Sequence, residues 1–439
     1  MRFARQLTED AWRVSIITMD PNHFDTHAKN DATLLERVSD GVTVHRTKVF
    51  RGLRKMAELK EGLRRITKKP MIERRPMSAS AAGTPLRHGA WQGLRDWLID
   101  IVQFPDPDIG WYWYALRRGG EILKKAHVDV ILSTAPPHTS HLIAARLSRR
   151  FNIAWVADFR DPMARIPFYW SRKDKKLKKA LWERLEKRIV AEADAVILNT
   201  DRMKREFENV YGEKVSQKLY CVPNGFDSEF LEKYNNIEPP QGDCLIITHA
   251  GSLYGSRNPT ALFEALALAI SQGLIPKEGI RLNLLGSYVR AWRLPEKVEE
   301  LKLGSVVNLL APVPHGEGLK SMAASHVLLV IQPESIIQVP AKLYEYMALR
   351  RPVLALAPEG AVGDLVREGN LGILVPPTNV DAIVNALRSL YEQRHHLATT
   401  YCQNEGYRHG FEGKALTRRL QHVLSWAKDQ KKGCRVNRS

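Results

Sequence analysis

Short apolar runs alternate with amphipathic stretches along almost the whole chain, and this alternation constrains the fold more than any other feature. Runs rich in Val, Ile and Leu are typical of strands that are buried on both faces of a parallel sheet. The stretches between them have the apolar spacing of helices, so the pattern predicts an α/β protein with parallel sheets. The predicted strands are residues 12–18, 42–47, 128–134, 153–159, 195–200, 219–224, 244–251, 280–286, 306–312, 326–332, 353–357 and 372–377.

The length of 439 residues predicts two domains, because a single hydrophobic core rarely grows beyond about 250–300 residues. Residues 1–240 form the predicted N-terminal Rossmann-like domain, with a basic and aromatic insertion at about 51–125. Residues 241–412 form the predicted C-terminal Rossmann-like domain. Residues 413–439 comprise an amphipathic helix over 413–428 and a basic tail, which we expect to pack back on the N-terminal domain.

The cysteines are widely spaced and include no C-x-x-C pair. This spacing favours a reducing compartment and argues against a structural zinc site or a disulfide framework. No uncharged apolar run is long enough to cross a membrane, and the N-terminus lacks the apolar core of a signal peptide. We therefore expect a cytoplasmic protein.

The net charge of +18 is concentrated in the first 200 residues, above all at 51–75 and 171–188. Basic surfaces attract anionic lipid headgroups, nucleic acid or phosphorylated substrates. Four tryptophans near the first block, Trp91, Trp97, Trp111 and Trp113, favour an anionic membrane surface, since Trp and basic residues gather at membrane interfaces. Two alternatives remain open, namely solvent-exposed basic helices and tryptophans packed in the core. The sequence matches no nucleic-acid-binding motif, so nucleic acid is an unlikely partner.

Residues 339–356 hold the strongest candidate binding site. The predicted buried strand at 326–332 precedes them. Pro340 then breaks the backbone, a helix is predicted to begin near Lys342, and Pro352 precedes another strand. Lys342 and the free amides of a helix N-terminus favour an anion such as a diphosphate. Glu345 follows one turn later, where its carboxylate can accept hydrogen bonds from vicinal hydroxyls. The alternative is a solvated Lys–Glu pair on the surface of the helix.

A second candidate segment begins at residue 248. The strand ends at Gly251, the following loop carries Arg257, and a helix opens near Pro259. Arginine offers paired donors that suit a diphosphate. The alternative is an ordinary tight turn, for which glycine serves in any α/β fold.

The first half places polar residues where predicted strands end. Asp158, Arg160 and Asp161 follow one strand, and His138 and His141 follow the strand before it. Ligands of open α/β sheets bind at such carboxyl ends. The alternatives are an Asp-Pro turn with an internal ion pair and histidines that cap a helix.

These segments closely resemble GT-B-fold retaining glycosyltransferases of the "glycosyl transferases group 1" (family 4-like) type, and STAPPH at 133–138 with ADFRDP at 157–162 resembles a bacterial subgroup that makes polysaccharides or lipid-linked glycans. The resemblance implies two Rossmann-like domains facing a cleft. It also implies transfer from a nucleotide diphosphate sugar to a saccharide or lipid-linked acceptor, with no cofactor and no strictly required metal. The charge and the tryptophans lead us to expect that this transfer occurs peripherally at the cytoplasmic membrane. Implied catalytic residues are Asp158, Arg160, Asp161 and His138. Implied donor-binding residues are Gly251, Ser252, Arg257, Gln338, Lys342, Leu343 and Glu345.

The chain departs from the family pattern at three places. Residues 2–7 look like the helix that follows the family's first strand and Gly-rich loop, so the first strand is expected to be missing. Ser252 stands where a basic residue is usual. Ile337 stands where the first of two motif glutamates is usual, and we expect Gln338 or the local backbone to take part of its role. These departures leave two alternatives open: an inactive scaffold of the same fold, or a nucleotide-sugar epimerase or phosphorylase.

Overall fold

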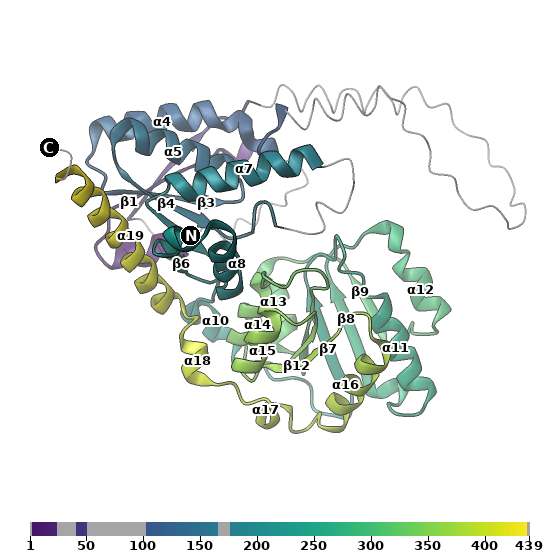
Figure 1. Ribbon diagram of the computed structural model, residues 1–439. Helices are drawn as coiled ribbons and strands as arrows, with labels where there is room; N and C mark the ends of the chain where they lie inside the picture. The colour runs from purple at the N-terminus through teal and green to yellow at the C-terminus, as the bar shows by residue number, and fades with distance from the viewer. Residues whose placement is uncertain (1, 24–40, 51–101, 166–175, 437–439) are drawn as a thin grey trace, which may run out of the picture.

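The computed structural model describes residues 2–23, 41–50, 102–165 and 176–436. The first basic block, Trp91 and Trp97 lie outside these residues. The described chain forms two α/β halves, and each has parallel strands covered by helices on both faces (Figure 1). This architecture is the predicted fold class.

The N-terminal half contains two parallel sheets. One pairs β1 (Val14–Met19) with β2 (Val42–Thr47), and the other has the order β3-β4-β5-β6. Its strands are β3 (Val130–Ala135), β4 (Ala154–Phe159), β5 (Ala195–Leu198) and β6 (Leu219–Cys221). Every residue of β4 and β5 is buried, as expected for central parallel strands.

The helices of this half lie in two layers. One face carries α4 (Tyr112–Lys125), α5 (Thr139–Phe151) and α7 (Lys176–Glu192). The opposite face is covered by α1 (Arg2–Glu9) and α19 (Gly413–Val436), which pack on each other and on the sheet. Shorter helices are α8 (Asp201–Tyr211) and α9 (Glu213–Ser216). The C-terminal helix thus returns to the N-terminal half and continues to Val436, through the residues predicted as a tail.

Strands β1 and β3 each pair on one side only among the described residues. Side chains from both strands nevertheless pack into the same two apolar clusters, Val14 with Val130 on the α19 side and Ile17 with Ile131 on the α4 side. In β3, Leu132 keeps 39% of its surface exposed. No described strand pairs with both β1 and β3, and the lack of a first strand stays a prediction.

The C-terminal half has one six-stranded parallel sheet of order β12-β11-β10-β7-β8-β9. Its strands are β7 (Leu245–Ala250), β8 (Ile280–Leu285), β9 (Val307–Leu310), β10 (Val327–Ile331), β11 (Val353–Leu356) and β12 (Gly372–Val375). One face packs on α11 (Thr260–Ser271), α12 (Leu294–Glu300) and α16 (Val380–Glu392). The other packs on α13 (His315–Ala323), α14 (Ala341–Ala348) and α15 (Ala361–Glu368). Strand order reverses between β7 and β10, where such sheets bind their ligands.

The chain crosses between the halves twice, and the two crossings are bonded together. The outgoing crossing leads into α10 (Ser228–Leu231), and the returning one follows α17 (Leu397–Thr400) and α18 (Glu405–His409). The Phe226 amide donates to the Phe411 carbonyl over 3.1 Å, and the Gly413 amide donates to the Phe226 carbonyl over 2.9 Å. A β-carbon at Gly225 would meet the Phe411 carbonyl oxygen at 2.1 Å, so this close approach requires glycine.

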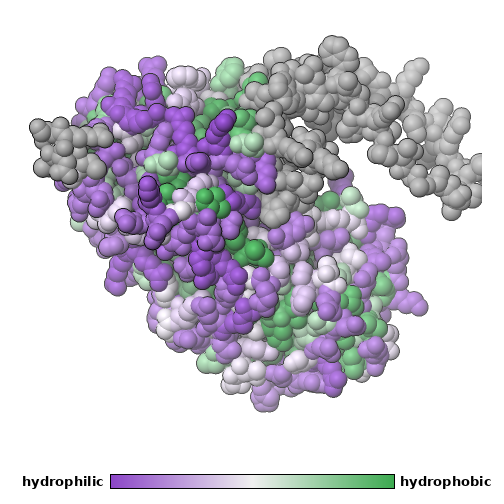
Figure 2. All heavy atoms as spheres, in the orientation of Figure 1, coloured by the Kyte–Doolittle hydropathy of each residue, from purple (hydrophilic) through white to green (hydrophobic). Residues whose placement is uncertain are grey.

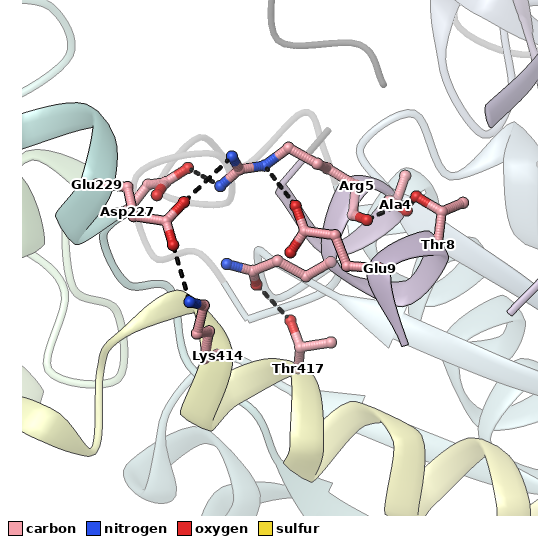
Figure 3. A network of polar contacts seen from close by, with 9 residues as sticks. Ala4, Arg5, Thr8, Glu9, Asp227, Glu229, Lys414 and Thr417 are labelled. Atoms are coloured by element: carbon pink, nitrogen blue, oxygen red, sulfur yellow. Dashed lines mark hydrogen bonds and ion pairs between the residues drawn. The ribbon is translucent and has the colours of Figure 1, made fainter. Parts of the chain in front are cut away.

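Charged side chains reinforce the crossings (Figure 3). Arg5 of α1 donates to Asp227 over 2.7 Å, and Lys414 of α19 lies 2.8 Å from Glu229. Beside them, the buried Thr417 hydroxyl donates to Gln6 over 2.6 Å. The first and last described helices, α1 and α19, therefore stabilise the two crossings from one side.

Two of the tryptophans in the predicted membrane-contacting region are described. Trp111 is buried against α5, whereas Trp113 keeps 73% of its surface exposed. Core packing thus accounts for Trp111 but not for Trp113. Within the described residues, no helix is long and apolar enough to span a bilayer.

Candidate active site

The candidate donor site lies where β7 and β10 separate. Their backbone pairing covers only Ile247 with Val327 and Thr248 with Leu328. Beyond these pairs, the Tyr346 hydroxyl of α14 bridges the strands, accepting from the Ala250 amide at 3.4 Å and donating to the Leu329 carbonyl at 3.3 Å. The separation opens the crevice that a reversal of strand order creates.

Glycines let the backbone and Lys342 approach each other closely in this crevice. Gly251 has φ +144°, and a β-carbon there would meet Cε of Lys342 at 2.6 Å. Gly286 has φ +151°, and a β-carbon there would likewise clash with the Gly251 carbonyl oxygen. Both positions need glycine for conformation and for space. Beside them, the Ser287 hydroxyl donates to Ser252 over 2.8 Å.

Arg257 is fixed above the end of β10. Its Nη2 and Nε donate to the Gln332 side-chain oxygen over 2.8 and 3.1 Å, and its guanidinium lies over the Tyr254 ring. Gln332 was not predicted as a site residue; its only sequence signal is a polar residue directly after an apolar strand. The structure therefore brings Arg257 and Lys342, far apart in sequence, to one crevice.

His249 was also missed by the sequence analysis. Its buried ring lies 2.9 Å, through Nδ1, from the Leu329 carbonyl, and Nε2 has no hydrogen-bond partner among the described residues. Burial, with smaller effects from the charges of Lys342 and Arg257, lowers the pKa of His249 to about 4. The ring is thus neutral at pH 7, with Nδ1 donating and Nε2 free to accept. A histidine interrupting an apolar strand just before glycine was the available signal.

Glu345 pairs with a histidine rather than with Lys342. His315 Nε2, at the start of α13, lies 3.1 Å from Glu345 Oε1. Glu345 Oε2 is buried without a hydrogen-bond partner in the part of the chain that the structure describes. A buried carboxylate oxygen of this kind is suited to accept a ligand hydroxyl. Leu343, which lies between Lys342 and Glu345 on α14, is fully buried in the core, so only its backbone is available to a ligand.

In the N-terminal half, Asp161 faces the C-terminal half. The Gln338 side-chain amide donates to Asp161 over 2.8 Å, and the Thr200 hydroxyl donates to the Ile337 carbonyl over 2.6 Å. The segment before α14 thus docks on the ends of β4 and β5. Ile337, which replaces the family's first glutamate, contributes its backbone to this contact.

Asp158 and Arg160 bond chiefly to each other. Arg160 Nε lies 2.8 and 2.9 Å from the two Asp158 oxygens, and Nη1 donates to the Val222 carbonyl over 3.0 Å. The pair therefore ties the end of β4 to the outgoing crossing. These contacts give it a structural role, and they leave its catalytic role as a prediction.

His138 lies beside Asp161 at the start of α5. The ring is buried against Trp182, and its Nδ1 has no hydrogen-bond partner within the described ranges. Burial lowers the pKa of His138, while the charges of Asp106 and Asp161 oppose the shift. His141 is instead a core residue whose Nδ1 lies 2.7 Å from the Ser133 hydroxyl. Asp106, a further unpredicted residue, accepts from the amide and hydroxyl of Thr139 and so anchors this helix start.

The described residues hold no group of three or more His, Cys, Asp or Glu side chains arranged to bind a metal ion. The crevice offers two cations, a neutral imidazole, a carboxylate and glycine-lined backbone.

Two parallel α/β halves, joined by paired crossings and contacting each other at strand ends, define the GT-B class. Residues 79–230 match Glycosyltransferase Family 4, and residues 245–393 match Glycosyl transferases group 1. The two matches together span more than half of the chain. The chain belongs to the group 1 type of GT-B glycosyltransferases.

Two relatives are similar to parts of the chain. The chain is 24% identical over 215 residues to a D-inositol 3-phosphate glycosyltransferase of Thermobifida fusca, covering 47% of this chain and 49% of that protein. It is 24% identical over 197 residues to an exopolysaccharide phosphotransferase of Streptomyces coelicolor, covering 45% of this chain and 19% of that protein. The chain thus spans less than half the length of either relative.

Solved structures share the fold. A sucrose-phosphate synthase from Thermosynechococcus elongatus aligns with a TM-score of 0.57 at 17% identity, over 99% of this chain and 91% of that one. HepE of Anabaena, solved in complex with UDP and glucose, aligns with a TM-score of 0.54 at 19% identity, over 70% of this chain and 81% of that one.

Proposed function

We propose that the chain transfers a sugar, with retention, from a nucleotide diphosphate sugar to a saccharide or lipid-linked acceptor in cell-surface glycan biosynthesis. The observation that carries this proposal is the convergence of Lys342, Arg257 and the free Glu345 oxygen where β7 and β10 separate. The two cations suit the diphosphate, and the carboxylate can accept hydrogen bonds from sugar hydroxyls. The complex of HepE with UDP and glucose supports a nucleotide sugar as donor.

The reaction breaks the bond between the anomeric carbon and the diphosphate oxygen and forms one to an acceptor oxygen. Negative charge grows on the departing diphosphate, so Lys342 and Arg257 stabilise the transition state more than the ground state. The acceptor proton passes to the leaving phosphate. Neither step requires a metal or a second protein carboxylate.

Four residues of the N-terminal half belong to the acceptor side of this proposal, and Gln338, in the loop before α14, belongs to the donor side. Asp161 and His138 lie together at strand ends, and Gln338 reaches Asp161 from the donor half. His138 would orient the acceptor hydroxyl as a neutral imidazole. Asp158 and Arg160 would hold the end of β4 in place, and the Gln338 amide would take part of the role of the absent glutamate.

The donor site is tested by two substitutions. Lys342→Ala and Glu345→Ala should each weaken binding of the matching nucleotide sugar by about 1–3 kcal/mol. Lys320→Ala, on the exposed face of α13, is the matched control and should bind normally. Calorimetry with UDP, GDP and their sugars measures the affinities. Unchanged binding in both site variants would remove the assignment.

One alternative function keeps the same donor site. A nucleotide-sugar epimerase would convert the donor without an acceptor, whereas a transferase releases nucleoside diphosphate only when acceptor is present. Product analysis with and without a saccharide acceptor separates them. Binding without either product would identify an inactive scaffold, which the Ile337 and Ser252 replacements favour.

We propose further that the chain works in the cytoplasm, peripherally on the inner face of the plasma membrane. The high positive charge and the exposed Trp113 support association with anionic lipid.

A further inference from the structure

Helices α4, α5 and α7 lie on the opposite side of the sheet from α19 (Figure 1). Side chains of these helices and of β4 line a groove over α5. Its volume is about 670 Å³. The floor consists of apolar side chains from three helices and β4: Leu116, Leu142, Ala145, Trp155, Leu185 and Ile189. We call this the α5 groove. It takes no part in the contacts between the two halves.

Arginines form the rim of the α5 groove. Arg146, Arg149 and Arg150 project from one side of α5, because residues three and four apart share a helix face, and Arg188 projects from α7. A single carboxylate on the rim, Glu192, lies 2.8 Å from Arg188 and 3.8 Å from Arg149. The rim therefore keeps an excess of positive charge.

Two rim arginines have no ionic partner in the described chain. Arg146 is exposed and makes no hydrogen bond or ion pair there, and the contact of Arg150 is with the ring of its neighbour Phe151. Both head groups are available to an anion. Arginine stems also lie readily along apolar surface while the guanidinium stays at its edge.

An exposed aromatic residue stands at one end of the groove. Trp113 packs edge-on against Tyr112, keeps 73% of its surface exposed and is followed by the 40%-exposed Tyr114. Tryptophan in this setting is typical of surfaces that meet lipid headgroups. Hydrophilic residues dominate the visible surface of this half, with hydrophobic ones showing among them (Figure 2).

We propose that the α5 groove binds an anionic phospholipid of a membrane surface. The phosphate contacts Arg146 and Arg150, acyl-chain carbons cover the apolar floor, and Trp113 lies at headgroup level. A free sugar or nucleotide fits poorly, because the floor offers it no hydrogen-bonding side chains. This inference rests on the proposed peripheral association and is independent of sugar transfer.

Vesicle flotation of the purified full chain tests the groove. The chain should float with vesicles of two parts phosphatidylcholine to one part phosphatidylglycerol, and not with phosphatidylcholine alone. The double variant Arg146→Glu/Arg150→Glu should partition at least about 30-fold more weakly, since each basic residue near such a surface contributes about 1 kcal/mol. Its melting temperature verifies that the fold is kept.

The control variant reverses the same number of positive charges elsewhere in the N-terminal half. Lys124→Glu/Lys125→Glu alters two exposed residues at the end of α4, outside the groove, and should bind within about threefold of the unchanged chain. An equal loss in both double variants, or no loss in the groove variant, would overturn the groove as the binding site. Absence of flotation by the unchanged chain would instead overturn peripheral association itself. Inorganic phosphate that released the chain from vesicles at millimolar concentration would identify a free-phosphate site.

Discussion

His249 illustrates how neighbours decide the chemistry of a single residue. As part of an apolar strand it attracts no attention in the sequence, yet it lies where β7 and β10 separate. Burial and two cations keep its ring neutral. The same crevice gives Glu345 a histidine partner and leaves one of its oxygens free. The chemical identity of the site thus depends on residues that meet only in the folded chain.

The lowered pKa of His249 predicts a pH effect on stability. Between about pH 6.5 and 4 the unfolded chain binds a proton at this residue that the folded chain does not. His249 therefore lowers the free energy of unfolding by up to about 1.4 kcal/mol for each unit that the pH falls. In His249→Gln, urea unfolding between pH 7 and 4 should show a smaller decrease. The exposed variant His396→Gln should retain the original slope, and identical slopes in all three proteins would contradict the prediction.

At the scale of elements, the two crossings act as one unit. The bridge between Phe226 and Glu412, the Gly225 approach to Phe411 and the Arg5–Asp227 bond hold α1, α10 and α19 together. The constraint on Gly225 is the backbone at Phe411, which lies nearly 190 residues later in the chain.

Gly225→Ala should therefore destabilise the protein. Its methyl group would meet the Phe411 carbonyl at 2.1 Å and Leu416 at 2.4 Å, so the crossings must move apart. We expect a loss of about 1–3 kcal/mol in thermal or urea unfolding. Gly304→Ala, where an added methyl meets nothing within 4 Å, is the matched control and should change stability little. Equal stabilities of the two variants would show that the crossings tolerate separation.

At the scale of the whole molecule, a few polar contacts set how the halves meet. The Gln338–Asp161 and Thr200–Ile337 bonds join the loop before α14 to the N-terminal sheet, and Arg202 of α8 binds Asp364 of α15. Partly exposed pairs of this kind contribute little to stability. They suit a junction that must open and close around a ligand.

Arg202→Gln should loosen this junction without unfolding either half. Hydrogen exchange of the 336–339 amides should accelerate several-fold, while the free energy of unfolding changes by less than about 1 kcal/mol. Arg388→Gln breaks a similar pair within α16 and should leave exchange at 336–339 unchanged. Exchange that stayed slow in Arg202→Gln would mean that the remaining bonds alone hold the halves together.

The sequence by itself determined the α/β class, all the strands of the described residues and the two segments that form the donor crevice, because strand and helix periodicity and strand-end glycines are local properties. Only the tertiary structure decided that Lys342 meets Gly251, that Glu345 pairs with His315 rather than Lys342, and that Arg160 reaches the Val222 carbonyl of the outgoing crossing. The α5 groove likewise exists only once three helices pack. Such pairings join residues far apart in the chain, and periodicity carries no information about them.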